Sequence, residues 1–166
     1  MNGPSKSREF TLRQATEQDI RQLSIHHRKM FEEIWEKKGQ QIGSSASIEI
    51  EQTYYRKLSK ELPAGSCRSW LIKKGNHIVA SGAITIVSLV PTPNDFSSKV
   101  AYLHSIYTER AFRGKSFANR IVREALEYCR ANGIKRVFLN ASDAGRPIYE
   151  RIGFSSSSDM MRIFVE

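Results

Sequence analysis

The sequence predicts a single domain of the mixed α/β class, built around one sheet. Its 166 residues are 40% hydrophobic and 26% charged, which is ordinary usage for one globular domain with a full core. Apolar residues at helical spacing dominate the first third, and apolar, β-branched runs follow. Helical and extended patterns then alternate towards the carboxyl end, which is typical of a sheet covered by helices. We expect one domain over residues 1–166, with 1–7 as a loose tail.

The individual elements follow from local signals, read in chain order. Thr16 is a helix N-cap with Asp19 three residues later, and Gly39 ends the helix that they begin. Pro63 is expected to stop the second helix, and Gly133 to follow the long third helix as its cap. The expected order is a strand over 10–13, a helix that begins at Thr16 and ends at Gly39, a helix over 48–62, strands over 69–73, 77–87 and 100–108, a helix over 115–132, a strand over 136–140, a short helix over 145–151 and a last strand over 160–165.

Charge and composition narrow the class of partner. Lys and Arg number 26 against 17 Asp and Glu, and the net charge of +9 favours nucleic acid, an acidic membrane or a phosphate-bearing cofactor. The basic residues are spread along the chain, which argues against nucleic acid. The two cysteines and four histidines show no metal-ligand spacing, so no metal is expected. Because the amino end lacks an apolar leader and the apolar run over 78–90 is short and interrupted, we expect a cytoplasmic protein with no membrane partner.

The most informative segment is the basic loop between the strand over 100–108 and the long helix. The start of a helix leaves backbone N–H groups unpaired and carries a partial positive charge. Gly114 and Ser116 keep large side chains away from those groups, and Ala118 lets the backbone come close. Arg113 and Lys115 add formal charge. Such a loop predicts a cradle for a pyrophosphate.

Two interpretations of this loop compete. Gly114-Lys115-Ser116 matches the end of the nucleotide-binding pattern G-x-x-x-x-G-K-[ST], but the opening glycine would be Glu109, which places a negative charge where phosphate should lie. The run Arg113 to Ala118 instead resembles the [Q/R]-x-x-G-x-[G/A] loop of the GNAT-type (GCN5-related) acetyl-CoA-dependent N-acetyltransferases. It departs from that pattern at Ser116, where the family usually has glycine.

A second segment supports the resemblance. Residues 139–154 are similar to the closing motif of the family, in which a strand and a short helix lead to the run Tyr-Glu-x-x-Gly-Phe. The resemblance covers roughly residues 69–165 and implies a central mixed, mostly antiparallel sheet with splayed central strands and helices on both faces. It also implies acetyl-CoA as the co-substrate. Carried over by motif position, the expected cofactor-binding residues are Ile106, Tyr107, Thr108, Arg113, Gly114, Lys115, Ser116, Phe117, Ala118, Asn140 and Ser142.

The catalytic candidates are Tyr149 and His104. Tyr149 matches the family tyrosine that often protonates the departing sulfur, and the alternative is a core tyrosine with a satisfied hydroxyl. His104 is a candidate base because imidazole titrates near neutrality, but a half-buried strand histidine is the more common situation. A chain of water molecules is the alternative base. Further candidates from the resemblance, each weighed against an ordinary helix or core position, are Glu32 and Glu33 for the base and Phe31, Trp35, Tyr54 and Tyr55 for the acceptor pocket.

These observations predict an N-acetyltransferase that moves an acetyl group from acetyl-CoA to a primary amine, by direct transfer in a ternary complex. The expected acceptor is a small molecule or an amino-acid-like compound, and a protein N-terminus or lysine is the second choice. The alternative from another class is a basic nucleic-acid-binding or regulatory module that keeps the fold without the activity. A homodimer is compatible with each of these interpretations.

Overall fold

The computed structural model describes residues 9–157 and 159–165, so the expected tail over 1–7 lies outside the described residues. Five strands form one sheet in the order β1-β2-β3-β4-β5. The first three pairings are antiparallel and β4 pairs with β5 in parallel, which confirms the expected mixed sheet. The elements are β1 (Thr11–Gln14), η1 (Glu17–Asp19), α1 (Ile20–Lys37), α2 (Ser44–Ala64), β2 (Cys67–Lys74), β3 (His77–Ser88), β4 (Lys99–Thr108), η2 (Arg110–Phe112), α3 (Phe117–Ala131), β5 (Arg136–Leu139) and α4 (Arg146–Ile152).

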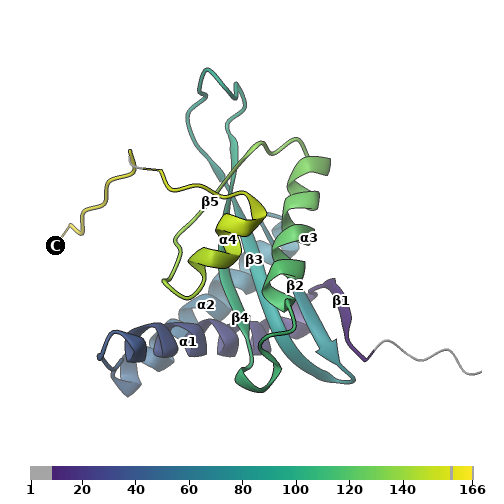
Figure 1. The fold of residues 1–166 in the computed structure, drawn as a ribbon, viewed down its shortest axis with the longest axis vertical. Coiled ribbons are helices and arrows are strands. Elements are labelled where there is room, and N and C mark those ends of the chain that lie inside the picture. Colours follow the sequence, from purple (N-terminus) through teal and green to yellow (C-terminus); the bar gives the residue numbers. More distant parts are fainter. Residues whose placement is uncertain (1–8, 158, 166) are drawn as a thin grey trace, which may run out of the picture.

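Helices cover both faces of the sheet, as expected (Figure 1). On one face, the apolar stripe of α3 buries Ile121 and Val122 completely against Ile84 and other strand residues. α4 contacts α3 on this side, and Phe154 just after it packs against the same core. On the other face, α1 and α2 close a smaller core around Leu58, which is fully buried.

The expected bounds of α2 and α3 and the expected last strand need correction. α2 begins at Ser44 rather than at residue 48, and it includes Pro63, because a proline in the last turn forfeits a single helical hydrogen bond. Gly65, with φ +77°, then ends the helix in the left-handed conformation. α3 begins at Phe117 rather than at residue 115. The expected last strand over 160–165 is wrong, since these residues pair with no strand among those described.

The middle of β4 carries the irregularity that shapes the site. Ser105 has φ +57°, a left-handed conformation that costs energy for any residue other than glycine. The register of β4 against β3 shifts at the same point, between Ser81 and Ala83. β4 also extends beyond its other neighbour, because its pairing with β5 ends at Leu103 opposite Leu139. Beyond Leu103, the residues His104, Tyr107 and Thr108 therefore pair with β3 alone, which gives the expected splayed strands.

Candidate functional site

The loop between β4 and α3 forms an open turn lined by backbone N–H groups. Gly114 has φ +77° and Ser116 has φ +60°, so both adopt the left-handed conformation. Ser116 thus takes, at some cost in strain, a conformation that glycine adopts freely. Within the described part of the chain, the N–H groups of residues 114–119 donate to no protein acceptor. These groups meet the requirement for an anion site at a helix start.

Arg113 lies in this loop but its guanidinium is directed to α1. It forms an ion pair with Glu33 at 2.7 Å, and its Nε donates to the carbonyl oxygen of Thr108 at 2.9 Å. Arg110 reaches the same carboxylate at 3.2 Å. Lys115, by contrast, is exposed, and its ammonium group lies 5.9 Å from the ring centroid of Phe10. Of the two predicted loop charges, only that of Lys115 has no acidic partner among the described residues.

Glu33 is a tether for the loop rather than a base. Its carboxylate also accepts a hydrogen bond from the Tyr107 hydroxyl at 2.9 Å. Burial alone would raise the pKa of Glu33, but the hydrogen bonds from Arg113, Tyr107 and Arg110 hold that pKa below its usual value. A carboxylate that is fixed in its ionised form by two guanidinium groups is a poor proton acceptor. The sequence marked Glu33 only as a base candidate and gave no signal for this tether.

Ile106, Tyr107 and Thr108, the predicted cofactor-binding residues of β4, make different contacts. The side chain of Ile106 points to the α3 face, where its Cδ1 would lie only 2.3 Å from a Cβ at Gly82. The side chain of Tyr107 points to the α1 face, where burial and the neighbouring Glu33 raise the pKa of its hydroxyl. The backbones of Tyr107 and Thr108 pair with β3 on one side, whereas Ile106 lies in the bulge and has no partner in the register; the carbonyl oxygen of Thr108 already accepts a hydrogen bond from Arg113.

Asn140 and Ser142 follow β5 at its carboxyl end, facing this open part of β4. Asn140 donates to the hydroxyl oxygen of Tyr102 at 3.0 Å. Ser142 instead caps the turn before α4, because its hydroxyl oxygen accepts the N–H of Gly145 at 3.2 Å. Tyr102 is thus a hydroxyl at the site that sequence reasoning missed. The available signal was the alternation of side chains along a strand, which places Tyr102 and Leu103 on opposite faces of β4.

Tyr149 lies in α4 with its ring half-buried against the α3 core and at 5.9 Å from the ring of Phe154. Its hydroxyl makes no hydrogen bond within the described residues. Burial, with Tyr102 nearby, raises the pKa of this hydroxyl to about 12. The phenol therefore keeps its proton at neutral pH and has no protein acceptor that competes for it. Gly145 lies close to the ring, since a Cβ there would be 3.0 Å from the ring carbon Cε2 and would need the ring to shift.

His104 belongs to a polar network between β4 and the two amino-terminal helices. Its Nε2 lies 2.8 Å from the Thr85 hydroxyl, and its Nδ1 lies 2.8 Å from the Ser105 hydroxyl. The same hydroxyl lies 2.7 Å from Nδ1 of His27, whose ring stacks on Tyr54. Burial lowers the pKa of His104 to about 3, so its imidazole is neutral. Because Ser105 has one proton to donate, at least one of the two Nδ1 atoms must itself be the donor.

The remaining candidates for the acceptor pocket lie in different environments. A cavity of about 750 Å³ opens at the connection between α1 and α2, lined by Arg28, Glu32 and the start of α2. Tyr55 is 47% exposed and lines a second cavity of about 590 Å³. Tyr54 is a core residue. The prediction that Phe31, Trp35, Tyr54 or Tyr55 lines an acceptor pocket therefore stays a prediction, with Tyr55 beside a cavity.

Two classes of site are not represented in residues 9–157 and 159–165. No cluster of three or more His, Cys, Asp or Glu side chains is arranged to bind a metal ion. Among the helices of this part of the chain, none combines the length and the apolar character needed to cross a bilayer.

Comparison with known proteins identifies the family. Residues 20–154 match the family described as Acetyltransferase (GNAT) family. Glucosamine 6-phosphate N-acetyltransferases of Trypanosoma brucei brucei and Arabidopsis thaliana are 25% and 27% identical over 64 and 63 residues, which are 39% and 38% of this chain. The matched segments span 44% and 42% of those relatives, less than half of their length.

The fold comparison agrees. A predicted acetyltransferase from Clostridium acetobutylicum, solved with acetyl-CoA, superposes with a TM-score of 0.84 at 22% identity, over 93% of this chain and 96% of that one. The chain belongs to the GNAT acetyltransferase family.

Proposed function

We propose that this protein transfers an acetyl group from acetyl-CoA to the primary amine of a small molecule or amino-acid-like compound. The observation that carries the proposal is the row of N–H groups over 114–119, at the start of α3 and after β4, which have no acceptor among the described residues. Support also comes from the relatives, since two are named for the acetylation of glucosamine 6-phosphate and a structural neighbour was solved with acetyl-CoA. A protein N-terminus or lysine is the second candidate acceptor.

The groups of the site fit the parts of acetyl-CoA. The N–H groups over 114–119 and the ammonium of Lys115 would hold the pyrophosphate, because they combine oriented donors with positive charge. The open edge of β4 at Ile106 and Tyr107 would hold the extended pantetheine arm by backbone pairing. Asn140, at the end of β5, would flank the arm from the opposite side. The thioester of acetyl-CoA supplies the activated acetyl group.

The role of the protein in the transfer is to position the reactants and to move two protons. Tyr149 is the proposed donor to the departing sulfur, since its hydroxyl stays protonated up to a pKa of about 12 and has no acceptor within the described residues. The attacking amine must lose a proton, as an alkylammonium has a pKa of about 10.4. With a pKa of about 3, His104 is a weak base. We therefore assign the amine proton to water and treat His104 as a residue that holds the β4 bulge.

Binding of acetyl-CoA is tested by calorimetry with a variant that leaves α3 intact. Ala118→Asp places a carboxylate in the first turn of α3, where it favours the helix dipole but repels a pyrophosphate. We expect the Kd for acetyl-CoA to rise at least about tenfold. Asn132→Asp changes the charge equally at the far end of the helix and should leave the Kd unchanged. Unchanged binding in Ala118→Asp, or binding of short DNA or RNA in place of acetyl-CoA, would contradict the proposal.

Turnover is tested with a panel of amines that includes glucosamine 6-phosphate, free amino acids and a lysine peptide. Tyr149→Phe should lower kcat by about 10²-fold or more with little effect on the Kd for acetyl-CoA, because general-acid catalysis is worth that much. Tyr128→Phe, near the far end of α3, is the matched control. A Tyr149→Phe variant with wild-type kcat on every accepted amine removes Tyr149 from the mechanism.

A further inference from the structure

Three aromatic side chains form a row on the face of the sheet opposite α3, where β4 and β5 meet. Val137 and Leu139 pack on the core under α3, so Phe138 between them points to the other face. The centroid of its ring lies 5.0 Å from that of Tyr102, its partner in the register of the two strands. Tyr102 in turn stacks on His104 at 5.5 Å, with 22° between the ring planes. We call Phe138, Tyr102 and His104 the ring row.

The helices on this face leave the β5 end of the ring row open. α1 packs on β3 and β4, and α2 packs on β2, but among the described residues neither helix makes a comparable contact with β5. Figure 1 shows α1 and α2 across the lower part of the sheet and β5 across its upper part. Of the described residues, Tyr102 and Phe138 belong to neither hydrophobic core, and both are only half-buried. Such rings, beyond the covered part of a sheet face, can receive a further apolar group.

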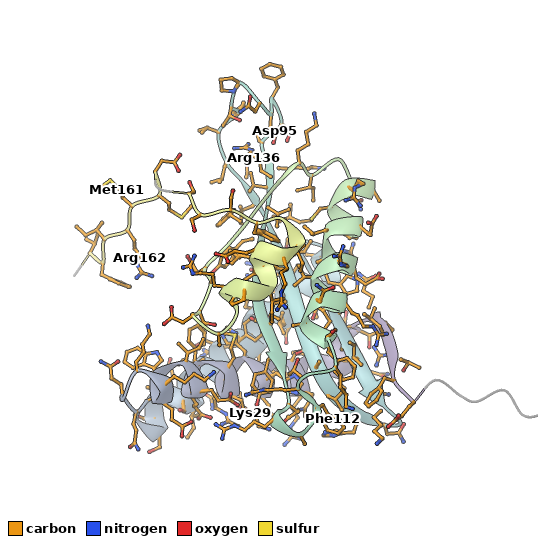
Figure 2. The ribbon with its side chains drawn as sticks, in the orientation of Figure 1. Lys29, Asp95, Phe112, Arg136, Met161 and Arg162 are labelled. Carbon is orange, nitrogen blue, oxygen red and sulfur yellow. The ribbon has the colours of Figure 1, made fainter. Side chains whose placement is uncertain are left out.

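The strand that carries Phe138 is held on both sides of this residue. Arg136, the first residue of β5, forms an ion pair with Asp95 at 2.8 Å and donates to two carbonyl oxygens of the hairpin between β3 and β4 (Figure 2). Just after β5, Asn140 donates to the hydroxyl oxygen of Tyr102 at 3.0 Å. The ring row is therefore ordered before a ligand binds, and binding does not have to supply that order.

The hydrogen-bond partners of the ring row are uncharged. Within the described part of the chain, they are the amide of Asn140 and the hydroxyl groups of Thr85, Ser105 and Tyr54. The imidazole of His104 is neutral because burial lowers its pKa to about 3, and Lys57, the cation that acts on it, is paired with Glu61. A phosphate on this surface would lose water without gaining a counter-charge. The ring row therefore favours an apolar, uncharged group.

The ring row also adjoins the groups that we assign to the transfer. Tyr102 lies near enough to Tyr149, the proposed proton donor, to help raise the pKa of the Tyr149 hydroxyl. Asn140, which contacts Tyr102, is the residue proposed to flank the pantetheine arm. A group bound on the ring row would thus lie beside the reacting thioester, within reach of a short amine chain.

We propose that the acceptor is a small primary amine that carries a flat aromatic ring, and that this ring lies against Phe138 and Tyr102. The inference rests on the proposed function, since it names the acceptor class of the same site. The rings of the row have similar orientations, and a further ring can join them in an offset-stacked or an edge-to-face arrangement. A saturated chain or a sugar lacks that interaction. Phe138 and Tyr102 are thus specificity-determining residues and take no part in the proton transfers.

Steady-state acetylation at saturating acetyl-CoA, followed by release of the CoA thiol, tests this preference. Phenethylamine should have a kcat/KM at least about tenfold above that of butylamine and of glucosamine 6-phosphate, because of the additional ring area that it buries. Phe138→Leu keeps an apolar side chain but removes the flat ring. It should raise the KM for phenethylamine about three- to tenfold and leave kcat, the KM for butylamine and the Kd for acetyl-CoA little changed. Tyr102→Phe, which keeps the ring, should retain the preference, and Phe96→Leu, at an 84% accessible phenylalanine, is the matched control.

The outcomes separate this inference from the proposed function. Equal kcat/KM values for phenethylamine and butylamine overturn the inference, and so does a Phe138→Leu variant with the wild-type preference. A peptide with an amino-terminal phenylalanine that is acetylated better than phenethylamine overturns the small-molecule class. If no amine is acetylated, the proposed function fails, and saturation-transfer NMR with CoA present decides on the ring row alone. Phenethylamine should then bind to the wild type and more weakly to Phe138→Leu, and absence of binding overturns the inference.

Discussion

Mild acid should destabilise this protein, because three histidines are enclosed in their neutral form. Burial lowers the pKa of His26 and of His27 to about 4 and that of His104 to about 3. In the unfolded chain, each imidazole takes up a proton as the pH falls through about 6.5. The folded chain binds none of these protons until about pH 4. The unfolded state therefore binds more protons between these limits, and stability must fall with pH across this window.

The size of the effect follows from the shifts. Each histidine contributes about 1.4 kcal/mol per pH unit once its unfolded form is protonated, which integrates to about 1.2 kcal/mol between about pH 7 and 5.5. His26 is fully buried, whereas His27 and His104 are half-buried and partly screened by water. We expect a total loss of roughly 2–4 kcal/mol. That is a large share of the about 5–15 kcal/mol that stabilises a typical domain.

Urea unfolding at several pH values measures this loss. His27→Gln removes one titrating group and retains an amide that can bond to Ser105. The free energy lost between about pH 7 and 5.5 should then be smaller by about 1 kcal/mol. His77→Gln, at the exposed first residue of β3, should leave the loss unchanged. A wild-type stability that is flat across this range, or a His27→Gln variant with an unaltered loss, would refute the reasoning.

Two further predictions concern packing. Gly82→Ala should destabilise the fold by about 1–3 kcal/mol, because the new Cβ would lie 2.3 Å from Cδ1 of Ile106. Ile106→Val removes that Cδ1 atom. A double-mutant cycle measured by urea unfolding should therefore give a combined cost smaller than the sum of the two single costs. Cys67 and Cys129 should resist iodoacetamide in the native protein and react once it is unfolded, since burial raises the pKa of each thiol to about 11. Labelling is followed by mass spectrometry, and rapid labelling of the native protein would contradict the burial of these thiols.

Much of the fold could be predicted because the signals are local. The periodic apolar stripe of α3 and the apolar, β-branched run of β3 identified those elements, and the order of elements then defined a covered sheet. The segment over 160–165 has residue types that favour a strand, but a strand also needs a neighbouring strand to pair with. The residue pattern along the chain does not show whether such a neighbour lies close enough. Pro63 misled for a similar reason, since a local rule was overridden in the last turn of α2.

The candidate site was predicted less completely. The loop over 113–118 and Tyr149 were singled out because they resemble family motifs; in the structure the loop follows β4 directly, and Tyr149 lies in α4 with Tyr102 of β4 nearby. The contact of Arg113 with Glu33 joins residues that are 80 positions apart, and no pattern along the chain encodes it. The same holds for the shared hydroxyl of Ser105 between His27 and His104, which depends on the bulge in β4.

The ion pairs from Arg110 and Arg113 to Glu33 also have a thermodynamic consequence for ligand capture. They join the turn ahead of α3 to a helix on the opposite face of the sheet, so its shape is set before any ligand arrives. The entropy cost of ordering that turn is therefore incurred during folding, and it does not weaken the binding of a ligand to the turn. Association through this turn should accordingly resemble docking to a rigid receptor, with little rearrangement of the backbone.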